Sequence, residues 1–417
     1  MKYRKLFDSK MSEMSAVLFG LAIFSLAVFI SCSSTAQTEP KETIPPEYLN
    51  IITPPLIISN INNPMPLPDF IYVTSDYMEN IQSRSKLSYW QGADRITTLP
   101  VPDGAGFSSA SVIKTENGTV YTAGGYKDSS GIWIACYWKG TERVDLPVPE
   151  GANGAIRDIA IYNGEVYVLG LFWYGYIGDG EQVCYWKDNV RADIAGAAWA
   201  IAAENGTVYI AGMYTGEDNV RKPCYWHETD RIDLPVPDGA AGSTGVITIY
   251  NGSVYTAGSY IENGIGKSCY WQNTERVELS ASGRIDAITV ADGTVYIAGS
   301  YIVDLNWQGA ASEVSWRRNN YSVFNAVTNN SLAYPVLSPP PIRWMICYWR
   351  GIERIDLSHV VYPHAPIRAI AAADGTVYNV AFTGGAYESG IYWENNVQYN
   401  LDTTGFGISV SAVFIDR

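Results

Sequence analysis

The sequence has few charged residues, and basic residues are the scarcer kind. Only 17% of its 417 residues are charged, and 28 Lys and Arg stand against 42 Asp and Glu, which gives a formal net charge of −14. A surface of this sign repels phosphate backbones, so we expect no nucleic-acid partner. The chain is 47% hydrophobic and rich in aromatic residues and glycine, with few apolar runs at helical spacing. This composition predicts a well-packed, mostly β protein.

Signatures of common catalytic and metal sites are also missing. There is no Gly-x-Ser-x-Gly nucleophile motif, no phosphate-binding Gly-Lys-Thr and no Asp-x-Asp-x-Asp calcium loop. The three histidines, His227, His359 and His364, lack partners at metal-ligand spacing. We therefore predict no metal and no cofactor, and we assign no catalytic residue.

The N-terminus carries an export signal. Lys2, Arg4, Lys5 and Lys10 precede an apolar run over residues 16–30, and Ser31 and Cys32 follow it. A basic leader with an apolar run of this length is typical of a signal peptide and is short for a membrane-spanning helix. The run resembles the lipobox of bacterial lipoproteins, which implies cleavage after residue 31 and lipidation of Cys32. An ordinary cleaved signal and an uncleaved anchor are the alternatives.

The other cysteines occupy one repeated position. Cys136, Cys184, Cys224, Cys269 and Cys347 each precede a Tyr-Trp pair. Equivalent positions in different repeats are normally too far apart for a disulfide. We therefore expect five free, buried thiols that act as small apolar side chains.

The Tyr-Trp pairs reveal an internal repeat. They begin at Tyr89, Tyr137, Tyr185, Tyr225, Tyr270, Tyr348 and Tyr392, so the spacing is 40 to 48 residues except for one interval of 78. Between them lie the turn dipeptides Asn117-Gly118, Asn163-Gly164, Asn205-Gly206, Asn251-Gly252, Asp292-Gly293 and Asp374-Gly375. Asn-Gly and Asp-Gly between apolar segments predict β-hairpins. Four short strands per unit predict an all-β fold, a single seven-bladed β-propeller of four-stranded blades.

The ends of the repeat region predict how the ring closes. Residues 69–77 align with a second strand, and residues 409–416 align with a first strand. The C-terminal strand (408–416) should therefore pair with the first strand of the domain (69–76) and leave no open edge. We divide the chain into a signal peptide (1–31), a Pro-rich tether (32–67) and the propeller (68–417), with an insertion in blade 6 (302–341).

The repeat unit combines four landmarks: Cys-Tyr-Trp, Arg-x-Asp-Leu, Asn-Gly-x-Val-Tyr and Ala-Gly-x-Tyr. Over residues 68–417 it resembles the repeats of a largely uncharacterised group of bacterial lipoproteins built as β-propellers. The resemblance implies the architecture and a lipid anchor, and it assigns no catalytic residue.

Residues that recur in every blade are interpreted as scaffold, since a functional group is needed only once. This applies to the tryptophans of the Tyr-Trp pairs, which we expect to fill the contacts between blades. It also applies to the Arg-x-acid pairs of the fourth strands, which are Arg143 with Asp145, Arg191 with Asp193, Arg231 with Asp233, Arg276 with Glu278, and Arg354 with Asp356.

Function is expected where the repeat fails, in the longer connections that share one face of the ring. The third unit has an aromatic loop, and the sixth has the insertion, which is either a binding surface or a lid. The ligand-binding candidates are Trp173, Tyr174, Tyr176, Trp307, Trp316, Arg317, Arg318, Tyr321 and Trp344.

Two functional hypotheses follow. The first is a monomeric propeller, anchored through a lipid at Cys32 to a membrane of the bacterial cell envelope and exposed to the periplasm or cell surface. It would act as a binding or scaffold module for a protein, peptide or glycan. The second is a carbohydrate-active hydrolase or lyase whose non-repeated acids meet at the mouth of the ring. Its candidate acids are Asp179, Glu181, Asp304 and Glu313.

Overall fold

The computed structural model describes residues 68–77, 86–92, 95–176, 180–280, 282–303, 343–358, 367–382, 390–395, 397–401 and 410–416. The expected signal peptide, Cys32, the tether and residues 304–342 of the insertion lie outside these ranges. Within the described part, no helix is long and apolar enough to cross a membrane.

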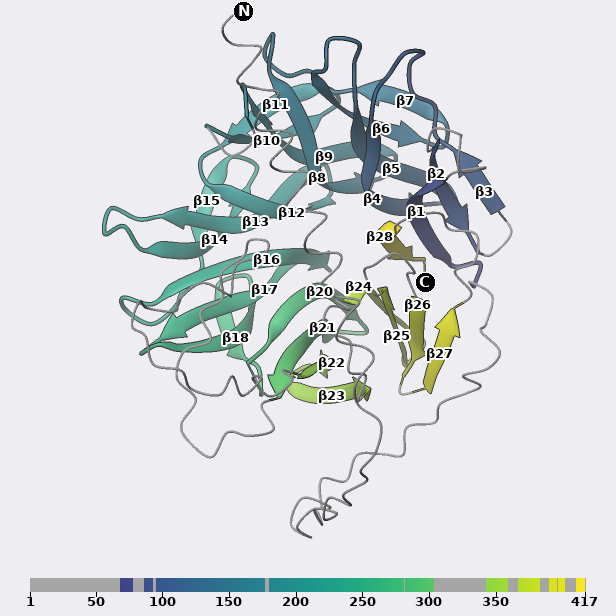
Figure 1. Cartoon of the computed structure of the whole chain (residues 1–417). Helices are drawn as coiled ribbons and strands as arrows, with labels where there is room; N and C mark the ends of the chain where they lie inside the picture. Colours follow the sequence, from purple (N-terminus) through teal and green to yellow (C-terminus); the bar gives the residue numbers. More distant parts are fainter. Residues whose placement is uncertain are drawn as a thin grey trace, which may run out of the picture. The chain divides into compact units, whose positions relative to one another are not determined.

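The described residues form seven antiparallel sheets of four strands (Figure 1). Blade 1 consists of β28 (Val410–Ile415), β1 (Ile71–Tyr77), β2 (Lys86–Gln91) and β3 (Arg95–Thr98). Blade 2 consists of β4 (Ser108–Glu116), β5 (Thr119–Lys127), β6 (Trp133–Lys139) and β7 (Glu142–Asp145). Blade 3 consists of β8 (Asn153–Tyr162), β9 (Glu165–Trp173), β10 (Gln182–Lys187) and β11 (Val190–Ile194). Blade 4 consists of β12 (Ala197–Glu204), β13 (Thr207–Thr215), β14 (Arg221–His227) and β15 (Asp230–Asp233).

The remaining three blades have the same strand order. Blade 5 consists of β16 (Ala241–Tyr250), β17 (Ser253–Glu262), β18 (Ile265–Gln272) and β19 (Glu275–Glu278). Blade 6 consists of β20 (Arg284–Ala291), β21 (Thr294–Val303), β22 (Arg343–Arg350) and β23 (Glu353–Ser358). Blade 7 consists of β24 (Ile367–Ala373), β25 (Thr376–Phe382), β26 (Gly390–Glu394) and β27 (Val397–Leu401).

The blades form a ring around their first strands. Each first strand contacts the first strand of the next blade, in the order β28, β4, β8, β12, β16, β20, β24 and back to β28. These seven strands surround the centre in Figure 1, and we call them the inner strands. The predicted seven-bladed β-propeller is confirmed.

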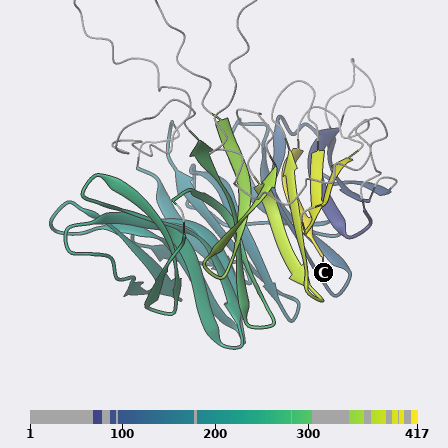
Figure 2. The same cartoon turned by 90° about the horizontal axis from the view of Figure 1, so that it is seen from below.

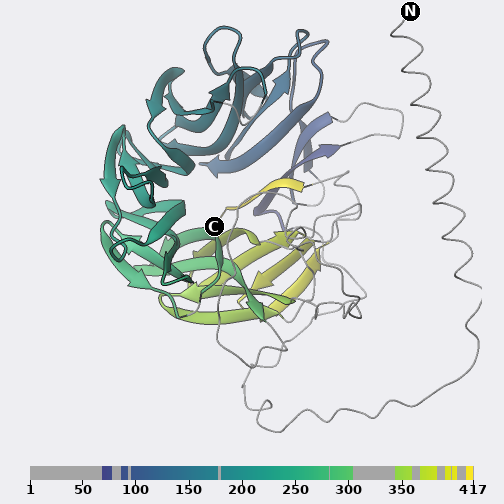
Figure 3. The same ribbon diagram turned by 60° about the vertical axis from the view of Figure 1, so that its left-hand side comes forward.

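The ring closes by pairing the two ends of the propeller. Strand β28 runs antiparallel to β1, with Ile71 opposite Ile415 and Val73 opposite Val413. Ile71 and Val73 are fully buried, so the closing pair is apolar as well as hydrogen-bonded. Figure 3 shows β28, in yellow, beside the purple strands of blade 1. The closure predicted from the sequence is confirmed.

The hairpin turns distinguish the two faces of the ring. Both residues of all six Asn-Gly and Asp-Gly dipeptides have positive φ, from 48° to 81°, as a type I′ turn requires. Figure 2 shows these tight turns along one side of the blades. Since the strands alternate in direction, the connections from second to third strand and from blade to blade lie on the opposite side. We call that side the loop face.

Every blade also carries a β-bulge near the loop-face end of its inner strand, which the sequence did not indicate. The pairing with the second strand shifts by one residue there in all seven blades. The residues skipped in the strand register are Ser111, Arg157, Trp199, Gly245, Asp286, Arg368 and Ser411. No residue type recurs at all seven positions, although the bulge itself is a repeated feature.

The repeated cysteines of the third strands lie opposite a repeated glycine of the second strands, beside each bulge. Cys136, for example, lies opposite Gly124, where an added Cβ would come within 2.0 Å of the Ser109 carbonyl oxygen. All five cysteines of the repeat are free and fully buried, as predicted. Burial raises the pKa of every one of these thiols, that of Cys184 to about 12. The equivalent positions in blades 1 and 7 hold the buried residues Ser88 and Ile391, consistent with a space-filling role.

The tryptophans of the Tyr-Trp pairs join neighbouring blades. They are at most 4% exposed, and three of them donate a hydrogen bond to the preceding connection between blades. Trp138 Nε1 donates to Pro100 O at 2.9 Å, Trp186 Nε1 to Pro147 O at 2.8 Å, and Trp271 Nε1 to Pro235 O at 3.0 Å. The predicted role of these indoles between blades is confirmed.

The indole hydrogen bond predicts a difference between two otherwise similar tryptophans. Trp349 is as buried as Trp186, but its Nε1 has no hydrogen-bond partner in the structure. Trp186→Phe and Trp349→Phe remove similar side-chain volume. Only Trp186→Phe also breaks the indole hydrogen bond and leaves the Pro147 carbonyl without this donor. We expect Trp186→Phe to lower the free energy of unfolding by about 1 to 2 kcal/mol more than Trp349→Phe. Urea unfolding followed by circular dichroism measures both, and equal losses would contradict this role.

Candidate functional site

A pocket of about 430 Å³ opens between blades 2 and 3. The elements that line it contribute their loop-face ends: the starts of β4, β6 and β8 and the ends of β5 and β9. Its lining consists of Ser109, Ser111, Gly124, Gly125, Lys127, Gly131, Trp133, Asn153, Gly154, Ala155, Ile156, Trp173, Gly175 and Tyr176. Small residues leave the space, and three aromatic side chains border it. We call it the aromatic pocket.

Blade 2 supplies one wall of the aromatic pocket. The ring of Trp133 meets Phe107 edge-on, with centroids 5.8 Å apart, and Lys127 Nζ lies 5.7 Å from the Trp133 ring. The Trp133 backbone N–H donates a hydrogen bond of 3.0 Å to Asn153 Oδ1 of blade 3. This bond fixes the start of β6 against the neighbouring blade and leaves the Asn153 amide N–H groups without a partner among the described residues.

Blade 3 supplies the opposite wall. Trp173 ends strand β9 and is 5% exposed, whereas Tyr176 follows the turn at Gly175 (φ 72°) and is 87% exposed. Tyr174, between them, is 55% exposed and does not line the pocket. The pocket therefore combines a buried indole with an exposed phenol that can contact a ligand.

The walls are built from positions that vary between blades. Lys127 pairs with Trp133 at the last rung between the second and third strands. The equivalent pairs are Thr215 with Arg221 in blade 4 and Ile302 with Trp344 in blade 6. These residue pairs lie just beyond the tyrosine of the repeated Ala-Gly-x-Tyr motif. The blades can therefore differ at this position without losing their common core.

The chemistry of the aromatic pocket suits binding of a polar, flat-faced ligand. Aromatic rings stack on the C–H faces of sugars, and hydroxyl and amide groups such as those of Ser109, Ser111 and Asn153 bond their hydroxyls. None of the described lining residues carries a carboxylate. The pair of acids that glycoside hydrolysis requires is therefore not found among them.

The structure describes only part of the predicted candidate set. Trp173 and Tyr176 line the pocket, and Tyr174 is exposed beside it. Trp344 lies in strand β22, paired with Ile302, and nothing further is described of its side chain. The candidates outside the described residues are Trp307, Trp316, Arg317, Arg318 and Tyr321.

Several pocket residues were missed from the sequence. Trp133 is one of six tryptophans outside the Tyr-Trp pairs. It would have been singled out if every tryptophan had been compared with the repeated positions. Lys127, Phe107 and Asn153 had no such signal. Lys127 and Phe107 contact Trp133 within blade 2, and the approach of blade 3 adds Asn153.

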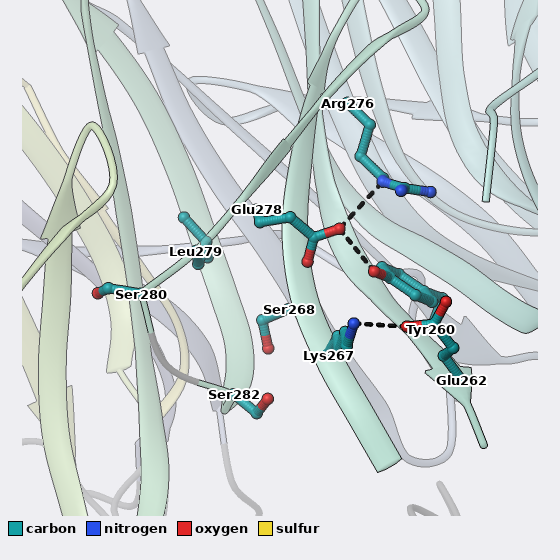
Figure 4. A pocket seen from close by; sticks show the side chains of 9 residues that line it. All are labelled: Tyr260, Glu262, Lys267, Ser268, Arg276, Glu278, Leu279, Ser280 and Ser282. Carbon is teal, nitrogen blue, oxygen red and sulfur yellow. Dashed lines mark hydrogen bonds and ion pairs between the residues drawn. The ribbon is translucent and has the colours of Figure 1, made fainter. Parts of the chain in front are cut away.

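A second pocket, of about 450 Å³, lies at the outer part of blade 5 (Figure 4). Tyr260 donates a hydrogen bond of 2.5 Å to Glu278 Oε1, and Arg276 Nε pairs with the same oxygen at 3.1 Å. Lys267 pairs with Glu262 at 2.5 Å. Burial, and then the bond to Glu278, raises the pKa of Tyr260 to about 12.

The charged group of this pocket is a repeated structural unit. Arg-x-acid pairs form within the fourth strands of blades 2 to 6, at 2.8 to 3.1 Å, as predicted. In blades 2, 4, 5 and 6 a tyrosine of the second strand also donates to the acid. Lys267 follows a glycine and precedes a serine, but it lies within strand β18 and not in a phosphate-binding loop. We therefore assign this pocket to the scaffold.

The acids of the enzyme hypothesis do not form a pair in the described structure. Glu181 contacts Arg157 at 3.7 Å, and Asp179, Asp304 and Glu313 lie outside the described residues. Burial lowers the pKa of Arg157, with Glu181 opposing that shift. Within the described ranges, no three His, Cys, Asp or Glu side chains gather where they could hold a metal ion.

No family model matches this chain, and no curated protein matches it in sequence. Solved structures do resemble it. A puromycin hydrolase superposes with a TM-score of 0.47 at 9% identity over 85% of this chain and 56% of the other. The β-propeller domain of the Trilobed protease from Pyrococcus furiosus gives 0.39 at 10% identity over 69% and 82%. The sialidase of Trypanosoma rangeli gives 0.38 at 8% identity over 79% and 58%.

One buried acid lies at the centre of the ring. Asp286 is the unpaired residue of the blade 6 bulge, and its side chain is 4% exposed. Its Oδ1 contacts Arg284 Nε at 2.6 Å, and it accepts a hydrogen bond from the backbone N–H of Ile367 in blade 7. Burial raises its pKa from 3.8 to about 6, against the opposing charges of Arg284 and Arg368.

This raised pKa predicts a specific pH dependence of stability. Because Asp286 binds its proton more tightly in the folded chain, its contribution to stability is complete below pH 4 and is lost as pH rises through 6. We expect the Asp286→Asn variant to gain up to about 3 kcal/mol relative to the parent between pH 4 and pH 7. Urea unfolding of both proteins across this range measures the difference. A difference that stays constant with pH would show that the carboxyl titrates normally.

Proposed function

We propose that this protein is a binding module that takes up a glycan at the aromatic pocket. The observation that carries the proposal is the set Trp133, Trp173 and Tyr176, gathered where neighbouring blades otherwise differ, in a pocket whose described lining includes no carboxylate. A flat sugar ring would stack against these side chains, while Asn153 and the two serines would bond its hydroxyls. A peptide with aromatic or proline residues is the alternative ligand.

We further propose that the propeller is held at a membrane of the bacterial cell envelope by a lipid on Cys32. The basic leader, the apolar run and the cysteine that follows it support this location. The Pro-rich residues 33–67, taken as a coil, would reach about 30 to 35 Å, enough to hold a binding face away from the membrane. A non-enzymatic, monomeric binding protein fits this arrangement.

The glycan proposal predicts unequal effects of three neighbouring aromatic residues. Tyr176→Ala should weaken binding about tenfold or more, because it removes an exposed stacking surface. Trp173→Ala should weaken binding as well, because it removes the buried indole that forms part of the pocket wall. Tyr174→Ala is the matched control, since its ring is exposed nearby but does not line the pocket. A glycan array identifies the ligand, and isothermal titration calorimetry then compares the variants.

Several results would contradict the glycan proposal. Loss of binding in Tyr174→Ala equal to that in Tyr176→Ala would place the site elsewhere. An array without any bound glycan, together with capture of an envelope peptide that requires Tyr176, would favour the peptide alternative.

The lipid anchor has its own test. Cys32→Ala should abolish incorporation of radiolabelled palmitate and release the protein from the membrane fraction, because no acyl chain can then be attached. Membrane flotation and palmitate labelling check this, with Cys136→Ala as the control that retains the lipid. Unchanged flotation of Cys32→Ala would favour an uncleaved signal anchor.

A further inference from the structure

The loop-face ends of two neighbouring inner strands carry a second cluster of charged residues. Arg284 begins the inner strand β20, and Arg368 is the second residue of the inner strand β24. These two strands are neighbours in the ring and lie side by side near its centre in Figure 1.

One of the two arginines pairs with a buried carboxylate, and the other lies close enough to act on its charge. Arg284 Nε contacts Asp286 Oδ1 at 2.6 Å, and the charge of Arg368 also acts on Asp286. The side chain of Arg284 is 54% exposed, and Arg368 is exposed as well. The cluster therefore has two accessible cations and one inaccessible anion.

The ion pairs of this cluster do not use all of its donors. Within the described part of the chain, Arg284 forms one ion pair, from Nε to Asp286 Oδ1, and Arg368 forms none. Guanidinium groups bind carboxylate and sulfate through paired N–H donors, and this geometry makes such bonds strong. Excess positive charge at one point of a chain with net charge −14 favours an anionic ligand.

Two neighbouring blades place charged residues at their bulges. Arg368 and Asp286 occupy the bulge positions of blades 7 and 6, where blades 1, 2, 4 and 5 have Ser411, Ser111, Trp199 and Gly245. Blade 3 also has an arginine there, Arg157, but it contacts Glu181 at 3.7 Å. A scaffold contact would recur from blade to blade, as the Arg-x-acid pairs of the fourth strands do. Bulges often direct a side chain towards a functional site.

We propose that Arg284 and Arg368 form an anion site that binds the carboxylate or sulfate group of an acidic sugar. The choice of a sugar rests on the proposed function, because the cluster and the aromatic pocket open on the same face of the ring. An oligosaccharide would then bind by stacking in the pocket and by charge at the loop-face ends of β20 and β24. The anion site itself rests only on the two arginines.

The test uses the full-length protein in detergent and two matched probes, trigalacturonate and its fully methyl-esterified form. Arg368→Gln should weaken trigalacturonate binding about tenfold or more and leave binding of the neutral ester unchanged, since only the acid pairs with the guanidinium. Arg284→Lys keeps the charge but loses the paired donors, so an intermediate loss is expected. Arg350→Gln is the control, because Arg350 is exposed on the opposite face.

The outcomes separate the two proposals. The anion site is overturned if trigalacturonate binding persists in Arg368→Gln, if it falls equally in Arg350→Gln, or if the methyl ester binds equally well.

If no probe binds but neutral array glycans bind through Tyr176, the anion site fails and the aromatic pocket stands. If the arginines govern binding and Trp173→Ala and Tyr176→Ala have no effect, the anion site stands and the pocket fails. Tighter binding of polyglutamate with the same arginine dependence overturns the sugar as ligand.

Discussion

The whole ring depends on the contact between each blade and the preceding one. A four-stranded sheet cannot bury both faces by itself, so each blade is stable only when its neighbours cover it. Here one indole per blade occupies that contact, and in three blades it also bonds the connection that leads into the blade. The same requirement applies at the chain ends, where β28 and β1 complete a blade that neither end could form alone.

This repeated core leaves two kinds of position free to differ between blades. One is the last rung between the second and third strands, where Lys127 and Trp133 meet in blade 2. The other is the bulge of each inner strand, where one residue leaves the pairing. Both lie on the loop face, so side chains that stabilise no repeated contact gather there. The aromatic pocket and the arginine cluster each use one of these kinds of position.

The two candidate sites differ in their physical character. The aromatic pocket offers flat apolar surface with a few hydrogen-bonding groups, which favours shape and stacking over charge. The cluster of Arg284 and Arg368 offers donors and positive charge around a carboxylate that burial makes hard to ionise. A ligand with both a sugar face and an acidic group would satisfy both sites. In both sites the ligand contacts come from non-repeated residues, whereas the repeated residues form the scaffold, as expected of a binding protein.

Sequence alone determined the architecture of this protein, because hairpin turns, apolar strands and buried indoles are local signals that recur with the blade. The Asn-Gly turns, the free cysteines and the closure of β28 on β1 were all predicted in this way. Trp173 and Tyr176 were found because they interrupt the pattern. Only the tertiary structure decided that Trp133 and Asn153 join them, and that Arg284 and Arg368 meet around Asp286. Those contacts cross between blades, where distance in space is set by packing and not by spacing along the chain.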